Sequence, residues 1–360
     1  MNNKRLIINI LPPPQRNISL DIIRAVAIVC VIAGHFFSLN TEFRSVPYHG
    51  ELSMFIQGMA NFLFEIGVPL FIMLTGYLNF KKKNYSWKYV YGMKKVLLSY
   101  LFFSVITVVF RKLYLYEGLS WLKMSTKILD FSAIPYAWYI EMWIGLYLLT
   151  PFLNRAYDAF GNEKKQKRWI LGVLTVLTAL PYLTNRYGLY LLPEFWKDIY
   201  PILFFFIGRF IQEYRPQLNW VFLIVLILII CALNPALSTV FANGHTMLNP
   251  IGNCFCLPGV VVAVAVFLLL LRIRDIKYGW LRKFVTRISI VSLEIYLCCY
   301  ISDQLLYPWF KDHFFINQCQ YGKYFFMIVP CLVIFSYLMA EAKGLLFHLC
   351  AKISSPKYCS

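Results

Sequence analysis

Residues 18–40 read ISLDIIRAVAIVCVIAGHFFSLN, and this stretch decides the fold. It is almost continuously apolar, and about 20 such residues are enough to cross a bilayer as a helix. Its ionisable side chains are Asp21, Arg24 and His35. A charged group at the centre of a membrane helix costs about 2.5–3.5 kcal/mol on insertion scales, so these three residues are also the first candidates for function.

Similar apolar stretches follow along the whole chain. Its 360 residues are 59% hydrophobic and 14% charged, whereas soluble domains carry about a quarter charged residues. The longest connecting loop runs from about Lys112 to Pro135. The sequence predicts an all-α, polytopic membrane bundle of about ten transmembrane helices and excludes a soluble fold. We place the spans at 18–40, 53–80, 95–114, 136–154, 168–184, 198–214, 219–235, 250–271, 288–309 and 324–348.

Positive charge is unevenly distributed between the loops. The chain has 35 Lys and Arg against 17 Asp and Glu, a net charge of +18. If both termini are cytoplasmic, 25 of the basic residues lie inside and 9 outside. Membrane topology follows this bias, so we expect both termini inside, with lipid rather than nucleic acid as the partner of the basic loops. The predicted parts are a cytoplasmic segment 1–17, a transmembrane domain 18–348 and a cytoplasmic tail 349–360.

The ionisable residues of the first span share one face of the helix. Arg24 and His35 are eleven positions apart, which corresponds to about three turns, with a rise of roughly 16 Å. Asp21 precedes Arg24 by three positions and can pair with it. One stripe of this helix can therefore hold an anionic group near the cytoplasm and a proton-transfer group further out. The alternative is a snorkelling arginine and a hydrogen-bonded bundle histidine. Further candidate carboxylates in other predicted spans are Glu65, Glu141, Glu294 and Asp303.

Four segments, in order, carry a resemblance to a known family. Residues 17–28 (NISLDIIRAVAI) with 32–35 (IAGH) resemble the opening of the acyltransferase family 3 membrane enzymes, whose first helix carries an Asp, an Arg and a His. Three later segments are similar to the second helix, the Trp-Tyr helix and the late Tyr-Leu helix of that family. They are GVPLFIMLTGYL at 67–78, AWYIEMWIGLYLLTP at 137–151 and SLEIYL at 292–297. The resemblance covers nearly the whole chain.

The resemblance implies an activity and a set of roles. Such enzymes move an acyl group, usually acetyl, from cytoplasmic acyl-CoA to a hydroxyl of a surface polysaccharide or lipid-linked saccharide. We expect His35, Arg24 and Asp21 as the catalytic set, with His35 as the base. Arg24, Lys94 and Lys95, together with Lys81, Lys82 and Lys83, would bind the polyanionic donor. Glu65, Glu141 or Glu294 would orient His35. The expected location is the cell membrane, and no metal site is expected.

The chain departs from the family pattern at three places. Lys94 and Lys95 stand where an Arg pair is common, Thr75 replaces a Ser, and Cys298 with Cys299 replaces a usual histidine. Lysine lacks the bidentate fork of arginine, so the resemblance is a weaker basis for predicting phosphate binding at Lys94 and Lys95. Alternatives to O-acetyl transfer are O-succinyl transfer by the same family, and a transporter or flippase of a lipid-linked saccharide. Cys254 and Cys256 are also candidates for a disulfide with Cys319.

Overall fold

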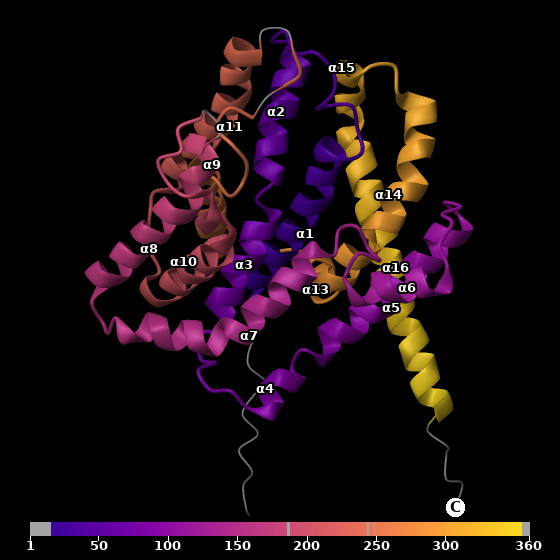
Figure 1. Cartoon of the computed structure of the whole chain (residues 1–360), viewed down its shortest axis with the longest axis horizontal. Helices are drawn as coiled ribbons and strands as arrows, with labels where there is room; N and C mark the ends of the chain where they lie inside the picture. The colour runs from indigo at the N-terminus through magenta and orange to yellow at the C-terminus, as the bar shows by residue number, and fades with distance from the viewer. Residues whose placement is uncertain (1–15, 186–187, 243–244, 248, 355–360) are drawn as a thin grey trace, which may run out of the picture.

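The chain forms a bundle of helices. The computed structural model describes residues 16–185, 188–242, 245–247 and 249–354. These residues form helices and loops, with an isolated antiparallel bridge between Pro47 and Thr246, which confirms the all-α prediction. The helices of Figure 1 are α1 (Ile18–Ser38), α2 (Leu52–Phe64), α3 (Gly67–Leu78), α4 (Trp87–Tyr91), α5 (Lys94–Leu113), α6 (Trp121–Leu129), α7 (Trp138–Ala159), α8 (Lys164–Ala179), α9 (Pro181–Thr184), α10 (Tyr200–Tyr214), α11 (Trp220–Ala242), α12 (Leu257–Leu271), α13 (Gly279–Ile290), α14 (Ser292–Phe314), α15 (Gln318–Tyr321) and α16 (Phe325–Ser354), with 3₁₀ helices η2 (Glu194–Ile199) and η3 (Gly322–Tyr324).

Several of these helices are long and apolar enough to cross a membrane. Among the described residues, five stretches meet this criterion, and the bent pair α13–α14 adds a sixth if it counts as one span. Each of the ten predicted spans overlaps a helix, but the number ten and the cytoplasmic termini remain predictions. Most of segment 1–17 and the end of segment 349–360 lie outside the described residues. The five stretches are Ile18–Ser38, Leu52–Leu78, Trp87–Leu113, Trp220–Phe241 and Gln318–Phe347.

Helix α1 lies in the middle of the bundle. Its N-cap is Asn17, whose side-chain oxygen accepts a hydrogen bond of 3.0 Å from the backbone N–H of Ser19 and so satisfies one of the free donors of the first turn. The helix contacts α2, α3, α12, α13, α14 and α16, and most of its residues are buried. The stripe that carries Arg24 and His35 therefore faces other helices of the bundle.

The predicted span 53–80 is broken into α2 and α3. The break lies at Glu65 and Ile66, and Gly67 then starts α3 in direct contact with α1. A Cβ on Gly67 would lie 2.7 Å from the carbonyl oxygen of Ala27, so a larger residue would push the two helices apart. Small residues allow such close helix packing in membranes. Leu52–Leu78 as a whole still meets the length and hydropathy criterion for one membrane span, in agreement with the predicted span 53–80.

The predicted span 288–309 is also broken, at Val291. The axes of α13 and α14 differ by 77° across this residue. Its backbone leaves the helical region at φ −101° and ψ 14°, so α14 starts again in a new direction. Figure 1 shows α14 leaving α13 in this new direction. Helix α14 contacts α1, and its Asp303 lies close to His35 near the end of α1.

The segment between α5 and α7 contains a helix that the sequence did not predict. Helix α6 occupies the middle of the expected loop from Lys112 to Pro135. Arg111, at the end of α5, forms two hydrogen bonds of 2.9 Å with Glu117 and also donates to the carbonyl oxygens of Ser132 and Ala133. Arginine suits this role because its planar fork has several donors. These hydrogen bonds of Arg111 hold the chain just before Tyr136, which reaches the candidate site.

Candidate functional site

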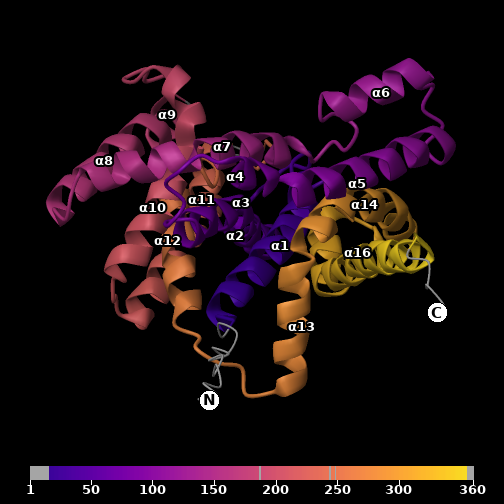
Figure 2. The ribbon, with the colours of Figure 1, turned by 90° about the horizontal axis from the view of Figure 1, so that it is seen from below.

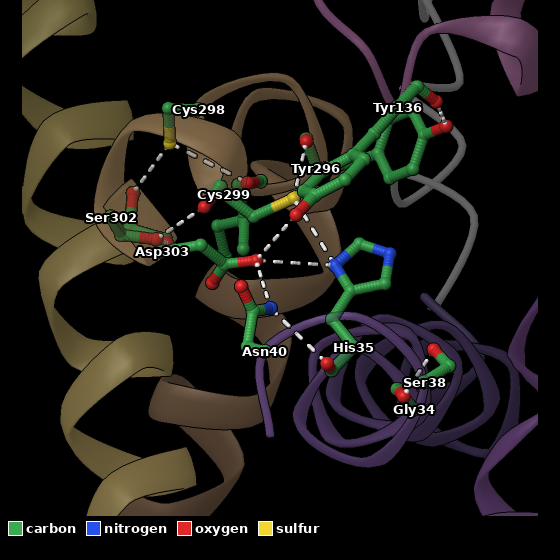
Figure 3. Close-up of polar contacts among 12 residues, drawn as sticks. Gly34, His35, Ser38, Asn40, Tyr136, Tyr296, Cys298, Cys299, Ser302 and Asp303 are labelled. Carbon is green, nitrogen blue, oxygen red and sulfur yellow. Dashed lines mark hydrogen bonds and ion pairs between the residues drawn. The ribbon is translucent and has the colours of Figure 1, made fainter. Parts of the chain in front are cut away.

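His35 lies opposite a buried carboxylate of α14. Its Nδ1 is 3.6 Å from Oδ2 of Asp303, whose side chain is fully buried (Figure 3). A separation of this size is longer than a normal hydrogen bond, but such contacts often shorten only when substrate is bound. A carboxylate on one ring nitrogen favours the tautomer with its proton on that nitrogen.

Two further groups hold Asp303 in place. The Tyr136 hydroxyl and the Asn40 side-chain amide each donate a 3.0 Å hydrogen bond to Oδ2 of Asp303. Asn40 also donates to the backbone oxygen of His35 at 3.1 Å, and the rings of His35 and Tyr136 lie 4.1 Å apart. Cys299, one of the residues in place of the usual family histidine, has its Sγ 4.0 Å from Nδ1 of His35. The imidazole is thus fixed from several sides.

The Nε2 atom of His35 is available for proton transfer. Figure 3 shows this second ring nitrogen pointing away from Asp303, and the side chain is 15% exposed. An imidazole with one nitrogen oriented by a carboxylate and the other free is the arrangement of a general base. The arrangement can accept a proton from a hydroxyl group that approaches Nε2.

The carboxylates expected to orient His35 do not reach it. Glu65 pairs with Arg44 at 3.0 Å, Glu294 pairs with Lys343 at 3.0 Å, and Glu141 is exposed. The assignment of this role to Glu65, Glu141 or Glu294 was therefore wrong in this structure. Asp303 was recognisable in the sequence as an ionisable residue within a predicted span, but nothing local relates it to His35.

Arg24 lines a separate cavity further down α1. This cavity has a volume of about 260 Å³ and lies between α1, α3, α5, α7 and α14. Arg24 donates a 2.9 Å hydrogen bond to Ser289 and lies 3.7 Å from Asp21. The cavity extends along the same face of α1 to Val31, one turn before His35. Its other polar lining residues are Thr75, Asn79, Tyr139, Trp143, Ser292 and Tyr296.

Asp21 is an anchor at the start of α1. It accepts two hydrogen bonds from Arg16, of 2.6 and 2.7 Å, and one of 2.7 Å from Ser289. The hydrogen bond to Asp21 raises the pKa of Arg16 and so favours the charged guanidinium. Asp21 therefore orients Arg24 and α13 and lies away from His35. The catalytic role predicted for Asp21 is therefore limited to positioning Arg24.

The structure does not bring Lys94 and Lys95 into the Arg24 cavity. Lys94 donates a 2.6 Å hydrogen bond to the Tyr91 hydroxyl and lies over that ring, and Lys95 is exposed. The residue of this helix that lines the cavity is Val96. Among the other basic residues proposed for the donor, Lys82 lies over the rings of Tyr89 and Tyr147, and the Tyr147 ring in turn contacts Trp143, which lines the cavity. The cysteines Cys254, Cys256 and Cys319 form no disulfide in this structure.

The comparisons with known proteins agree with the sequence resemblance. A family model described as an acyltransferase domain matches residues 17–339. No curated protein and no solved structure matches the chain. The matched range begins at the N-cap of α1 and ends within α16, so it includes His35, Asp303 and Arg24. Because this match spans nearly the whole chain, the protein belongs to acyltransferase family 3 and is a membrane acyltransferase.

Proposed function

We propose that the protein transfers an acetyl group from acetyl-CoA to a hydroxyl of a surface polysaccharide or of its lipid-linked precursor. The observation that carries the proposal is the pairing of His35 with Asp303, which orients one ring nitrogen and leaves Nε2 free. Transfer of an acyl group to a hydroxyl requires removal of the hydroxyl proton as the new bond forms. His35 is the described residue whose position suits that step.

In the proposed reaction His35 accepts one proton and later returns it. Nε2 of His35 takes the proton of the acceptor hydroxyl while its oxygen attacks the thioester carbonyl. The C–S bond breaks, the CoA sulfur leaves as thiolate, and the imidazolium returns the proton to it. Asp303 stabilises the imidazolium through Nδ1, and Tyr136 and Asn40 keep Asp303 directed at the ring.

The Arg24 cavity suits the thioester end of the donor. Its walls are mostly apolar, with one cation and a few hydrogen-bonding groups, which matches a pantetheine arm that carries amides but no charge. We expect Arg24 to contact a polar group of the donor and the nucleotide to lie outside, near Lys81, Lys82 and Lys83. The direction from Arg24 to Val31 then leads the acyl group toward His35.

The proposal includes a membrane topology. In Figure 1 the last turn of α16 lies on the lower side of the bundle, and Figure 2 shows the start of α1 from that same side. We propose ten crossings, with both termini in the cytoplasm and the protein in the cell membrane. Acyl-CoA then enters from the side of Arg24, and the acceptor reaches His35 from the opposite side.

An assay with labelled donors tests this function directly. Membranes containing the protein, and matched membranes without it, are incubated with acetyl-CoA or succinyl-CoA labelled in the acyl group and with a crude glycan pool. We expect acetyl label in an alkali-labile glycan ester. Label from succinyl-CoA alone would identify succinyl-CoA as the donor. The absence of label from both donors, with folded protein, would favour transport of a lipid-linked saccharide.

Replacing Arg24 with lysine is expected to weaken donor binding. The substitution keeps one positive charge but removes the guanidinium fork and the hydrogen bond to Ser289. We expect the KM for acetyl-CoA to rise about tenfold with a smaller change in kcat. The matched control is K94Q/K95Q, which changes two exposed basic residues outside the cavity. A larger increase of KM in the control than in R24K would show that the donor binds at Lys94 and Lys95 rather than at Arg24.

Replacing Tyr136 with phenylalanine is expected to reduce turnover without affecting donor binding. The variant keeps the ring beside His35 and loses the hydrogen bond to Asp303. We expect kcat to fall about tenfold, since the carboxylate is then held by one donor fewer, with an unchanged KM for acetyl-CoA. The control is Tyr114→Phe, at an exposed tyrosine in the segment after α5. Equal kcat values for both variants would exclude a positioning role of Tyr136.

A further inference from the structure

A second, strongly basic hollow lies at the start of α1. It has a volume of about 560 Å³ and lies between the first turn of α1, the end of α3, the end of α10 and the end of α12. Three arginines line it, namely Arg215, Arg272 and Arg274, together with the polar groups of Asn17, Ser19 and Gln217. None of its lining residues belongs to the Arg24 cavity.

The walls of this hollow are held by specific contacts. The Ser19 hydroxyl donates a 2.6 Å hydrogen bond to the carbonyl oxygen of Ile273, which ties the exit of α12 to the start of α1. Figure 2 shows the connection from α12 to α13 passing beside this first turn of α1. Arg272 donates to the carbonyl oxygen of Leu218, and Arg215 ends α10 in the left-handed region with φ +42°. The arginines are thus brought together by the fold.

The charge of these arginines is not balanced within the protein. All 17 Asp and Glu residues of the chain lie in the described ranges, and none of them forms an ion pair with Arg215, Arg272 or Arg274. The nearest in sequence is Asp275, which lies in an adjoining hollow and pairs with Arg282 at 3.5 Å.

Some other cations of the bundle are paired. Arg209 contacts Asp158 at 2.9 Å, and Lys167 contacts Glu213 at 2.8 Å. What distinguishes Arg215, Arg272 and Arg274 is that all three line the same hollow, and that no Asp or Glu is among its lining residues.

We propose that this hollow binds a phosphate-bearing anion. Arginine recognises phosphate by two parallel hydrogen bonds, and the free N–H groups of a helix start add to the attraction for an anion. Exposed aromatic residues follow the lining residues closely in the sequence, with Trp220 after Gln217 and with Tyr278 and Trp280 after Arg274, as at a membrane interface. The phosphate can thus belong to an anionic lipid headgroup or to a soluble compound, and basic pockets between helix ends bind such headgroups.

Binding is tested on the purified full-length protein. Thermal unfolding is followed by tryptophan fluorescence in micelles of an uncharged, phosphate-free glycoside detergent, with either phosphatidylglycerol or inorganic pyrophosphate titrated in. The test variant is R215Q/R274Q, because the side chains of these two arginines form no ion pair or hydrogen bond among the described residues, whereas Arg272 supports the chain at Leu218. The matched control is K165Q/R168Q, which removes two exposed charges from α8.

We expect the wild type and the control to be stabilised by one of the two ligands with equal apparent Kd. The apparent Kd of R215Q/R274Q should be about thirtyfold weaker, since each of the two arginines near an anionic surface contributes about 1 kcal/mol. A response to phosphatidylglycerol identifies a lipid site, and a response to pyrophosphate identifies a soluble ligand. If R215Q/R274Q does not fold, R215K/R274K keeps the charge and should still show a weaker Kd. No response of the wild type, or equal Kd values for test variant and control, would overturn the proposal.

Discussion

Replacing His35 with alanine is expected to reduce acyl transfer by about 10²–10⁴-fold, the usual contribution of a positioned general base. The loss should appear in kcat, while the KM for acetyl-CoA stays near the wild-type value, because the Arg24 cavity ends one turn before this residue. The measurement is the initial rate of acetyl transfer at saturating donor, with variant and wild type at equal amounts of folded protein.

The control for this variant is His313→Ala. His313 lies on the same helix as Asp303 but is exposed, and its Nδ1 contacts the carbonyl oxygen of Trp309. We expect the control to retain wild-type turnover. The H35A protein should also fold, because Tyr136 and Asn40 still donate to Asp303 in the absence of the imidazole. Turnover of folded H35A within twofold of the wild type would remove His35 from the mechanism.

The parts of the fold that could be predicted are those that depend only on residues near one another in the sequence. The first span was placed at 18–40, and α1 runs from Ile18 to Ser38, because a long apolar run in a bilayer must form a helix to satisfy its backbone. The breaks at Glu65 and at Val291 could not be predicted in this way. Gly67, which begins α3 just after the first of these breaks, packs against Ala27 of α1, a residue far away in the sequence.

The candidate site likewise contains residues that the sequence could identify and residues that it could not. His35 and Arg24 could be recognised because both lie on one face of a single helix, and helical spacing relates them. The partner of His35 could not, since Asp303 comes from a distant helix and is directed to His35 only by the bend between α13 and α14. Asn40 and Tyr136 lie outside regular helices, where spacing carries no information about contacts.

Replacing Asp303 with asparagine is expected to lower kcat by about 10²–10⁴-fold while leaving the protein at least as stable as the wild type. The amide keeps an oxygen for the hydrogen bonds of Tyr136 and Asn40, but it removes the negative charge that stabilises the imidazolium and selects the tautomer of His35. The other carboxylate oxygen, Oδ1, is buried and has no hydrogen-bond partner among the described residues. A neutral amide at this place is less costly to bury than a carboxylate.

A double-mutant cycle shows whether Asp303 acts through His35. If it does, D303N should have almost no further effect on the residual rate of H35A, so the two losses will be far from additive. Asp312→Asn is the matched control, because Asp312 is exposed on the same helix and should leave kcat unchanged in either background. Additive losses, or a fall in unfolding temperature that accounts for the lost activity, would show that Asp303 supports the fold rather than the imidazole. Non-additive losses in a stable protein would establish Asp303 as the positioning residue of His35, in the place where the sequence suggested three glutamates.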